Sequence, residues 1–285
     1  MIKKYIIDFN VKEIERVGFR HVLLRLCRED GGQLPMMMPG QFAEVRVDGE
    51  PRTFLRRPIS VCDVDYERGE VWLLVAAVGA GTRRLAALRE GDSLNCILPL
   101  GNGFTLSEAS SGMRALLVGG GTGIAPLLFL GRKLCERGCM PTFLLGAKSK
   151  NQLPLTEKFR RYGAVHLSTE DGSAGSHGFV TDNPVLKYTS LGAPRPDGQP
   201  AAQHSIIDPS PNCLFDRIYA CGPKPMMIAI ARYARLNGIP CEVSLENMMA
   251  CGIGACLCCI EPTVNGNRRV CADGPVFNVD NLLWT

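Results

Sequence analysis

The sequence of 285 residues contains no apolar run that approaches the ~20 residues of a membrane-spanning helix. Its first ten residues, MIKKYIIDFN, lack the long apolar core and small-residue cleavage site of a secretory signal. Low-complexity stretches and internal repeats are also missing, and a hydrophobic share of 46% excludes a disordered chain. We therefore expect a cytoplasmic protein of about two domains, perhaps with a small third, and no membrane contact.

Clustered basic side chains are missing as well. Residues 111–240 hold fifteen basic against eight acidic side chains, residues 1–110 are balanced, and residues 241–285 hold two against five. The basic excess is scattered, which favours a solvated surface or an anionic small ligand over nucleic acid. The four histidines are isolated and no Gly-x-Ser-x-Gly elbow lies near them, so we assign no catalytic side chain.

Cysteine, by contrast, is abundant: thirteen are many for a cytoplasmic chain, where disulfides are rare. Eight are scattered, mostly in apolar runs, but five lie within the twenty-one residues from Cys251 to Cys271. Cys251, Cys256 and Cys259 have the spacing C-x4-C-x2-C, which matches the plant-type [2Fe–2S] spacing, and Cys271 follows after eleven residues. This pattern predicts an iron–sulfur cluster with these four thiolates as ligands.

A structural zinc site is the alternative for the same thiols. Zinc knuckles favour two separated pairs of closely spaced ligands, whereas here three thiols share one loop with one distant partner. The spacing therefore favours iron–sulfur over zinc. Cys258 stands outside the pattern, because only one residue separates it from Cys256.

The order of sequence patterns predicts a β plus α/β architecture. Residues 1–110 show short runs of β-branched and aliphatic residues, typical of an antiparallel barrel, with one short helix over Thr82–Glu90 capped by its threonine. Residues 111–240 alternate strand, glycine turn and helix, as in a parallel α/β sheet. Residues 241–285 form a small cysteine-bearing segment. The proline-rich stretch Leu191–Asn212 is expected to be an irregular surface insertion.

Two further motifs suit an anionic ligand. Gly119–Pro126 (GGGTGIAP) directly follows an apolar strand, and such a turn brings N–H groups and a helix start to a pyrophosphate. Glycine turns also serve packing, and the strict G-x-G-x-x-G spacing is absent. Arg56–Ser60 (RRPIS) presents a guanidinium and a hydroxyl on an extended strand, which suits a phosphate, although an exposed edge strand with a salt-bridged arginine is the simpler alternative.

The chain resembles one family along nearly its whole length, through the motifs RRPIS, VGAGT, GGGTGIAPL, TEDGSAGSHGFVTD, YACGPKPMM and ACGIGACLCC…VCADGPVF. This is the family of electron-transfer subunits of NAD-dependent dihydroorotate dehydrogenase, in the ferredoxin reductase superfamily. The resemblance implies a six-stranded FAD-binding barrel over residues 1–110. It implies a nicotinamide-nucleotide-binding domain over residues 111–240 and a [2Fe–2S] domain over residues 241–285.

The resemblance also assigns residues to each cofactor. Those matched to FAD include Arg57 at the pyrophosphate and Ser60 near the flavin, and are Arg57, Pro58, Ile59, Ser60, Gly81 and Thr82. Those matched to the nicotinamide nucleotide are Gly119, Gly120, Gly121, Thr122, Cys221, Gly222 and Pro223. The cluster ligands are Cys251, Cys256, Cys259 and Cys271. Cys258, where small residues are usual, and the long Leu191–Asn212 stretch depart from the family pattern.

The implied function is an electron relay in pyrimidine biosynthesis. A separate FMN-containing catalytic subunit would oxidise dihydroorotate to orotate, and the two chains would form a heterotetramer. Electrons would pass through the cluster to FAD and leave as hydride to NAD, because a flavin exchanges electrons singly and in pairs. The alternatives are a reductase subunit of the ferredoxin:NADP oxidoreductase or sulfhydrogenase type, and a non-catalytic zinc-stabilised binding module.

Overall fold

The computed structural model describes residues 3–187 and 214–284. The stretch Leu191–Asn212, which we expected to be a surface insertion, lies outside these residues. Among the helices of the described ranges, none has the length and apolar character needed to cross a membrane.

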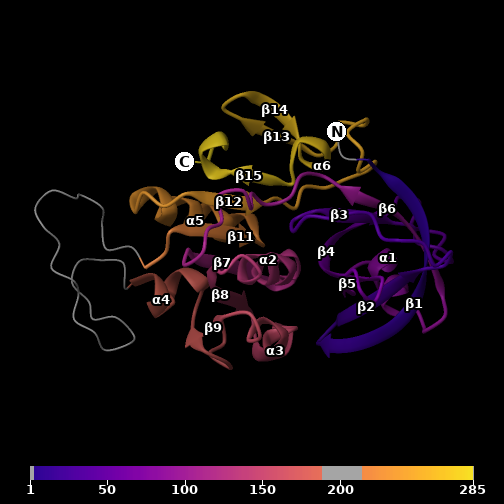
Figure 1. The fold of residues 1–285 in the computed structure, drawn as a ribbon, viewed down its shortest axis with the longest axis horizontal. Coiled ribbons are helices and arrows are strands. Elements are labelled where there is room, and N and C mark those ends of the chain that lie inside the picture. Colours follow the sequence, from indigo (N-terminus) through magenta and orange to yellow (C-terminus); the bar gives the residue numbers. More distant parts are fainter. Residues whose placement is uncertain (1–2, 188–213, 285) are drawn as a thin grey trace, which may run out of the picture.

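Six strands of the N-terminal half close into an antiparallel barrel, which confirms the expected fold (Figure 1). Taken around the barrel, they are β1 (Tyr5–Gly18), β2 (His21–Arg28), β5 (Glu70–Ala76), β4 (Arg57–Asp65), β3 (Phe42–Val45) and β6 (Ser93–Leu100). Alternate residues of β1 point inward: Ile7, Phe9 and Val11 are buried in the barrel core, whereas Ile6 is 70% exposed. The strand period of two thus fills the core and leaves the other face to solvent.

The short helix of the barrel, α1 (Ala80–Ala86), begins earlier than expected, and the prediction that Thr82 caps it is wrong. Gly79 precedes the helix, and Thr82 lies in its first turn. The Thr82 Oγ1 accepts hydrogen bonds from the N–H groups of Val78 (3.1 Å) and Gly79 (2.9 Å). The threonine therefore still satisfies free backbone donors, but it does so from inside the helix.

The C-terminal half is built on a seven-stranded sheet, which confirms the predicted α/β alternation. Its strands, in spatial order, are β10 (Ser176–His177), β9 (Ala164–Thr169), β8 (Met140–Ala147), β7 (Arg114–Gly120), β11 (Arg217–Cys221), β12 (Cys241–Ser244) and β15 (Val276–Asn278). All neighbours are parallel except β12 and β15. The strand order reverses between β7 and β11, and ligands of open α/β sheets bind at such a switch point.

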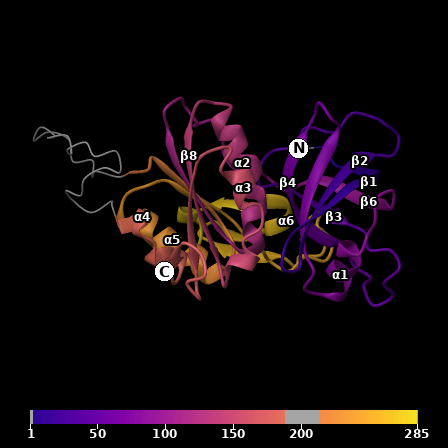
Figure 2. The same ribbon diagram turned by 90° about the horizontal axis from the view of Figure 1, so that it is seen from below.

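Helices cover both faces of this sheet. Ala115 and Leu117 of β7 pack with the face that carries α2 (Ala125–Cys135) and α3 (Thr156–Phe159), while Leu116 and Val118 pack with α5 (Lys224–Leu236). Figure 2 shows α2 and α3 on the side of the barrel and α5 on the opposite side. The remaining short helices are α4 (Pro184–Lys187) and the 3-10 turns Gly121–Ile124, Lys150–Gln152, Val180–Asp182 and Val279–Asn281.

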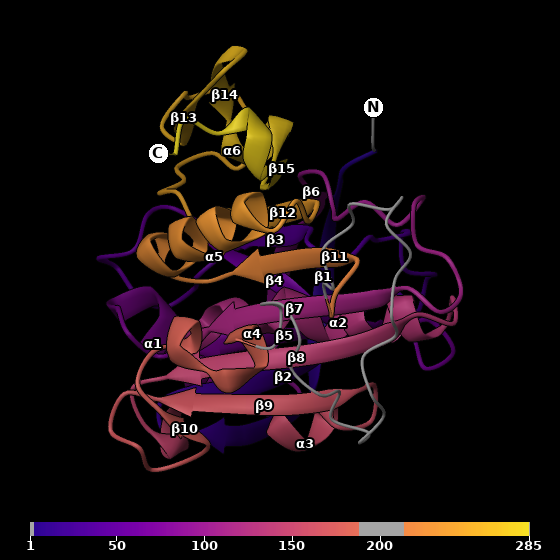
Figure 3. The ribbon, with the colours of Figure 1, turned by 90° about the vertical axis from the view of Figure 1, so that its left-hand side faces the viewer.

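Residues 241–285, expected as a separate domain, supply two strands of this sheet, β12 and β15. Between them lie the hairpin β13 (Ile260–Thr263) and β14 (Gly266–Arg269) and the helix α6 (Val270–Asp273), which project beyond the sheet (Figures 1 and 3). We call residues 245–275 the cysteine segment. The domain limits at residues 110 and 240 stay predictions.

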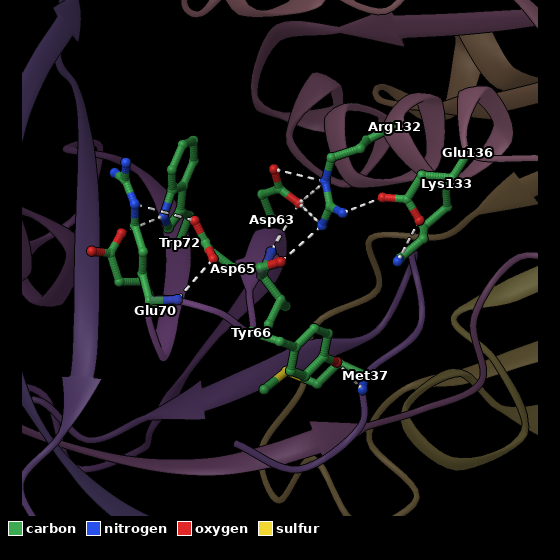
Figure 4. A network of polar contacts seen from close by, with 11 residues as sticks. Met37, Asp63, Asp65, Tyr66, Glu70, Trp72, Arg132, Lys133 and Glu136 are labelled. Atoms are coloured by element: carbon green, nitrogen blue, oxygen red, sulfur yellow. Dashed lines mark hydrogen bonds and ion pairs between the residues drawn. The ribbon is translucent and has the colours of Figure 1, made fainter. Parts of the chain in front are cut away.

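A buried ion pair joins the barrel to the sheet domain. In Figure 4 the guanidinium of Arg132 on α2 faces the carboxylate of Asp63 on β4. Its Nη2 lies 2.6 Å from Asp63 Oδ1 and 2.8 Å from the Val64 carbonyl oxygen, and its Nη1 lies 2.5 Å from Glu136 Oε1. Phe129, three residues earlier on α2, packs into the barrel core. Charge and apolar contact thus hold the two halves together at the same helix.

Arg132→Met is expected to lower the free energy of unfolding by about 3 kcal/mol, because Asp63 would stay buried without its counter-charge. Arg137→Met, at an exposed position just beyond α2, should change it by less than ~0.5 kcal/mol. Urea denaturation of both variants measures the difference. Equal losses for the two variants would contradict a special role for Arg132.

Candidate functional site

The barrel, the sheet domain and the cysteine segment meet around one cleft of about 310 Å³. Each part contributes a motif: the start of β4, the turn at α1, the glycine turn after β7, and the chain that leads into the first thiol. The lining includes Pro58, Ile59, Ser60, Thr82, Thr122, Glu246, Asn247, Met248 and Met249. Motifs that are far apart in the sequence therefore share one space.

Two of the residues matched to FAD phosphate approach each other beside this cleft. A Cβ atom added to Gly81 would lie 3.4 Å from Arg57 Cδ and 2.9 Å from Thr53 Cγ2, so the backbone at Gly81 lies close to the arginine stem. Arg57 donates to the carbonyl oxygens of Arg56 (3.0 Å) and Leu55 (3.2 Å). A cation beside a glycine backbone suits a pyrophosphate.

The glycine turn and the Cys-Gly-Pro motif lie side by side at the switch point. Gly119 is paired with Cys221 across β7 and β11. A Cβ atom at Gly120 would lie 2.8 Å from Pro223 Cδ, and one at Gly222 would lie 2.9 Å from the Gly120 nitrogen. Close packing between the two turns therefore excludes a side chain at Gly120 and at Gly222.

Gly121 differs from its neighbours in the turn. Its φ is 56°, a left-handed conformation that favours glycine, and an added Cβ atom would meet nothing within 4 Å. The open space at this residue leaves its backbone accessible to a ligand. Thr122, the next residue, lines the cleft.

The cysteine loop, Cys251–Cys259, turns its backbone N–H groups toward a thiol. Cys251 Sγ accepts hydrogen bonds from the nitrogens of Ala255 (3.3 Å) and Cys256 (3.4 Å). Positive φ values at Gly252 (63°), Gly254 (88°) and Leu257 (61°) make this turn possible. Burial raises the pKa of the Cys251 thiol, but N–H groups in the loop outweigh it and lower the pKa to about 6.

The four predicted ligands form two contacting pairs. Cys251 pairs with Cys256, and Cys259 pairs with Cys271, whose nitrogen donates to Cys259 Sγ at 3.3 Å. Burial and the Cys259 thiol raise the pKa of Cys271 to about 12, so the Cys271 thiol becomes a thiolate only beside a cation. Two pairs of thiols suit a group that takes two thiolates on each of two metal ions. No three Cys, His, Asp or Glu side chains of residues 3–187 and 214–284 are arranged to hold a single ion.

The two pairs of thiols differ in their exposure to solvent. Cys259 and Cys271 are buried, whereas Cys256 is exposed and Cys251 is half-buried. Cys258 is exposed too, beside the buried Cys259. All five thiols are free of disulfides. One side of the loop thus faces the protein and the other faces outward.

Glu44 on β3 lies directly beneath this loop. It is fully buried, and neither carboxylate oxygen has a hydrogen-bond partner among the described residues. Burial raises the pKa of Glu44 to about 7, although Arg57 and Arg56 act in the opposite direction. A Cβ atom at Gly252 would lie 2.3 Å from Glu44 Cγ and 2.5 Å from its Oε1. Only glycine at position 252 therefore allows the loop to pack on the barrel.

The residues just before the first thiol, Glu246–Met249, line the cleft, although the sequence assigned none of them to a cofactor site. They carry no turn, spacing or charge pattern of their own. The available signal was their position between a sheet strand and Cys251, because a short connection of this kind must pass near both.

Comparison with known proteins agrees with this geometry. A family profile described as the iron-sulfur cluster binding domain of dihydroorotate dehydrogenase B matches residues 246–283. The protein "Dihydroorotate dehydrogenase B (NAD(+)), electron transfer subunit" of Shouchella clausii is 42% identical over 253 residues, 87% of each chain. The protein of the same name from Bacillus cereus is 36% identical over 291 residues, 99% of each chain.

The chain belongs to the family of dihydroorotate dehydrogenase B electron transfer subunits. The resemblance drawn from the six motifs is therefore confirmed. Among solved structures, an NADH-dependent reduced ferredoxin-NADP oxidoreductase has a TM-score of 0.78 and 28% identity. The match covers 97% of this chain and 90% of that one, so the electron transfer subunit and this oxidoreductase share a fold throughout.

Gly252→Ala is expected to displace the cysteine loop, because the new methyl group would overlap the Glu44 side chain, and bound iron per chain should fall at least about twofold. Gly266→Ala is the matched control, since Gly266 also has a positive φ (84°) but an added Cβ atom would meet nothing within 4 Å. Iron content after identical purification measures both. Equal iron content in the two variants would show that the contact with Glu44 does not determine the position of the cysteine loop.

Proposed function

We propose that this chain passes electrons between a flavin on a separate catalytic subunit and NAD, through its own [2Fe–2S] cluster and FAD. The catalytic subunit would oxidise dihydroorotate to orotate. The observation that carries the proposal is the shared cleft, which brings the barrel motif, the glycine turn and the chain leading into the cysteine loop to one place. When bound, nicotinamide exchanges two electrons as hydride, the cluster exchanges one, and the flavin does both.

The barrel motif would hold FAD. Arg57 would supply charge to the pyrophosphate, and Gly81 would let the backbone approach it. Pro58, Ile59 and Ser60 line the cleft and would contact the flavin. Thr82 lines the cleft as well, with its hydroxyl oxygen already engaged by two backbone donors. A flavin held by these residues would lie in the cleft that the barrel shares with the sheet domain and the cysteine segment.

The switch point would hold the nicotinamide nucleotide. Gly119 and Gly120 end β7, and Gly121 and Thr122 follow it. Cys221 ends β11, and Gly222 and Pro223 follow it. Both turns lead into helices, whose N–H groups favour a pyrophosphate. Because Thr122 also lines the flavin cleft, a nucleotide at this turn would lie next to FAD.

The thiolates of Cys251, Cys256, Cys259 and Cys271 would hold the cluster. N–H groups of the loop stabilise negative charge on Cys251, as an anionic cluster requires. The two contacting pairs would supply four thiolates to the cluster. Cys258 is left outside this set.

The comparisons bear on the first of the two alternatives, a reductase subunit of another complex, and a spectrum would test the second, a zinc-stabilised binding module. Relatives that are 36–42% identical carry the dihydroorotate dehydrogenase name over most of their length, whereas the ferredoxin-NADP oxidoreductase is 28% identical. The dihydroorotate system is therefore favoured over another reductase complex. An absorption spectrum with flavin and cluster bands would exclude the zinc-stabilised module, and a colourless zinc protein would overturn the relay.

The partner would be an FMN-containing catalytic subunit in a cytoplasmic heterotetramer. Leu257 is 60% exposed between Cys256 and Cys258, and Ile253 is 46% exposed on the same loop. Leu257 also holds a left-handed backbone conformation, which a leucine rarely adopts. Apolar side chains around the exposed thiols suit the core of an interface that excludes water from the path of the electron.

Cys256→Ser is expected to remove the cluster and leave FAD stoichiometric, because one thiolate of four is lost while the flavin residues lie on the barrel. NADH should still reduce the flavin. Cys258→Ala, the matched control on the same loop, should keep its iron and its visible absorption. Loss of FAD together with iron in Cys256→Ser, or loss of iron in Cys258→Ala, would contradict these assignments.

Leu257→Asp is expected to weaken binding of the catalytic subunit at least about tenfold, because a charge would be buried in the interface core. Iron and FAD content should not change. Leu236→Asp, at an 87% exposed leucine at the end of α5, is the control and should bind normally. Size-exclusion coelution and titration with the catalytic subunit measure both. If Leu257→Asp binds the catalytic subunit as tightly as the native chain does, this loop is not part of the interface.

A further inference from the structure

A polar bridge connects the flavin cleft to the chain that follows the cysteine loop. Asn247 lines the cleft, and its Nδ2 donates to the carbonyl oxygen of Ile260 at 3.3 Å and to Glu261 Oε2 at 3.0 Å. Ile260 directly follows Cys259, one of the four proposed cluster ligands. The side chain of Asn247 therefore links the cleft directly to the residue that follows a proposed cluster ligand.

Glu261 is the centre of this bridge. It is buried on β13, and its other oxygen, Oε1, accepts from Lys224 Nζ at 2.8 Å and from Trp284 Nε1 at 3.3 Å. Lys224 directly follows the Cys-Gly-Pro motif and begins α5. One carboxylate thus ties together the cleft, the nucleotide-binding turn, the cluster hairpin and the chain end.

We propose that Asn247 and Glu261 are positioning residues, which fix the distance between the cluster and the flavin and so set the rate of electron transfer between them. This inference rests on the proposed function. The rate of single-electron transfer falls steeply as the two carriers move apart. A displacement of the cysteine loop that leaves the fold stable therefore still slows this step. A buried carboxylate with donors on both oxygens has one favoured position, which makes it a rigid reference point.

The two oxygens of Glu261 accept hydrogen bonds from different donors. The amide and the carboxylate of the bridge can therefore be exchanged between positions 247 and 261. Asn247→Asp removes the donor and sets a second carboxylate beside Glu261, so the bridge should open. Glu261→Gln sets two amide groups against each other. In the double variant, the new amide oxygen at position 261 can still accept from Lys224 and Trp284, while the amide nitrogen donates to the new carboxylate at position 247. The contact between positions 247 and 261 is then restored with its polarity reversed, whereas the bond to the Ile260 carbonyl oxygen stays lost.

The test uses the full chain loaded with FAD and cluster, mixed rapidly with NADH. Asn247→Asp should slow reduction of the cluster at least about tenfold relative to reduction of the flavin in the same chains, with both rates referred to bound FAD and bound iron. The double variant should reduce its cluster at least about threefold faster than Asn247→Asp does, a coupling that independent sites do not show. Hydrogen exchange of residues 260–269 should rise in Asn247→Asp and be lower in the double variant than in Asn247→Asp.

Asn237→Ala is the matched control, because it also removes an amide donor to a carbonyl oxygen (Tyr233, 2.8 Å), but at the far end of α5. It should leave cluster reduction unchanged. Native cluster reduction in Asn247→Asp, a double variant no faster than Asn247→Asp, or equal slowing in Asn237→Ala would overturn the bridge. A native chain that holds neither FAD nor iron would overturn the proposed function itself, and it is checked first.

Discussion

The site exists only while the barrel and the sheet domain keep one fixed orientation, and the contact between α2 and β4 imposes it. Arg132 and Asp63 form a buried ion pair, and Phe129 of the same helix inserts into the barrel core. The helix that carries this contact begins directly after the glycine turn. Any rotation of the barrel would therefore displace the flavin side of the cleft and the nucleotide turn against each other.

The cysteine segment is held from two sides by this same frame. On the barrel side, Gly252 packs on Glu44, and Asn102 donates to the carbonyl oxygens of Ala272 (3.4 Å) and Asp273 (3.1 Å). On the sheet side, β12 and β15 enclose the segment at both ends. The loop with the exposed thiols is consequently an extension of rigid elements, although it projects from the surface.

Local patterns predicted most of the architecture, because they depend on neighbouring residues alone. Strand periodicity gave the barrel, the alternation of strand and helix gave the parallel sheet, and C-x4-C-x2-C gave the loop. The addition of β15 to the sheet was not predictable in this way. It pairs with β12 across the whole cysteine segment, and nothing in Val276–Asn278 indicates its partner. The start of α1 was not predictable from its threonine either. A threonine can accept hydrogen bonds from free backbone donors at the cap or, as Thr82 does, from inside the first turn.

The glycines show why the site itself was only partly predictable. Gly120, Gly222 and Gly252 each exclude a side chain because another segment lies within 3 Å of the Cβ position. Gly121 has open space instead. A sequence gives all four the same letter, and only the positions of distant segments distinguish a glycine packed against another segment from one beside open space. Glu44 and Glu261 follow the same rule: each is an acidic residue in a strand, and each acquires its role from the segment that the fold places against it.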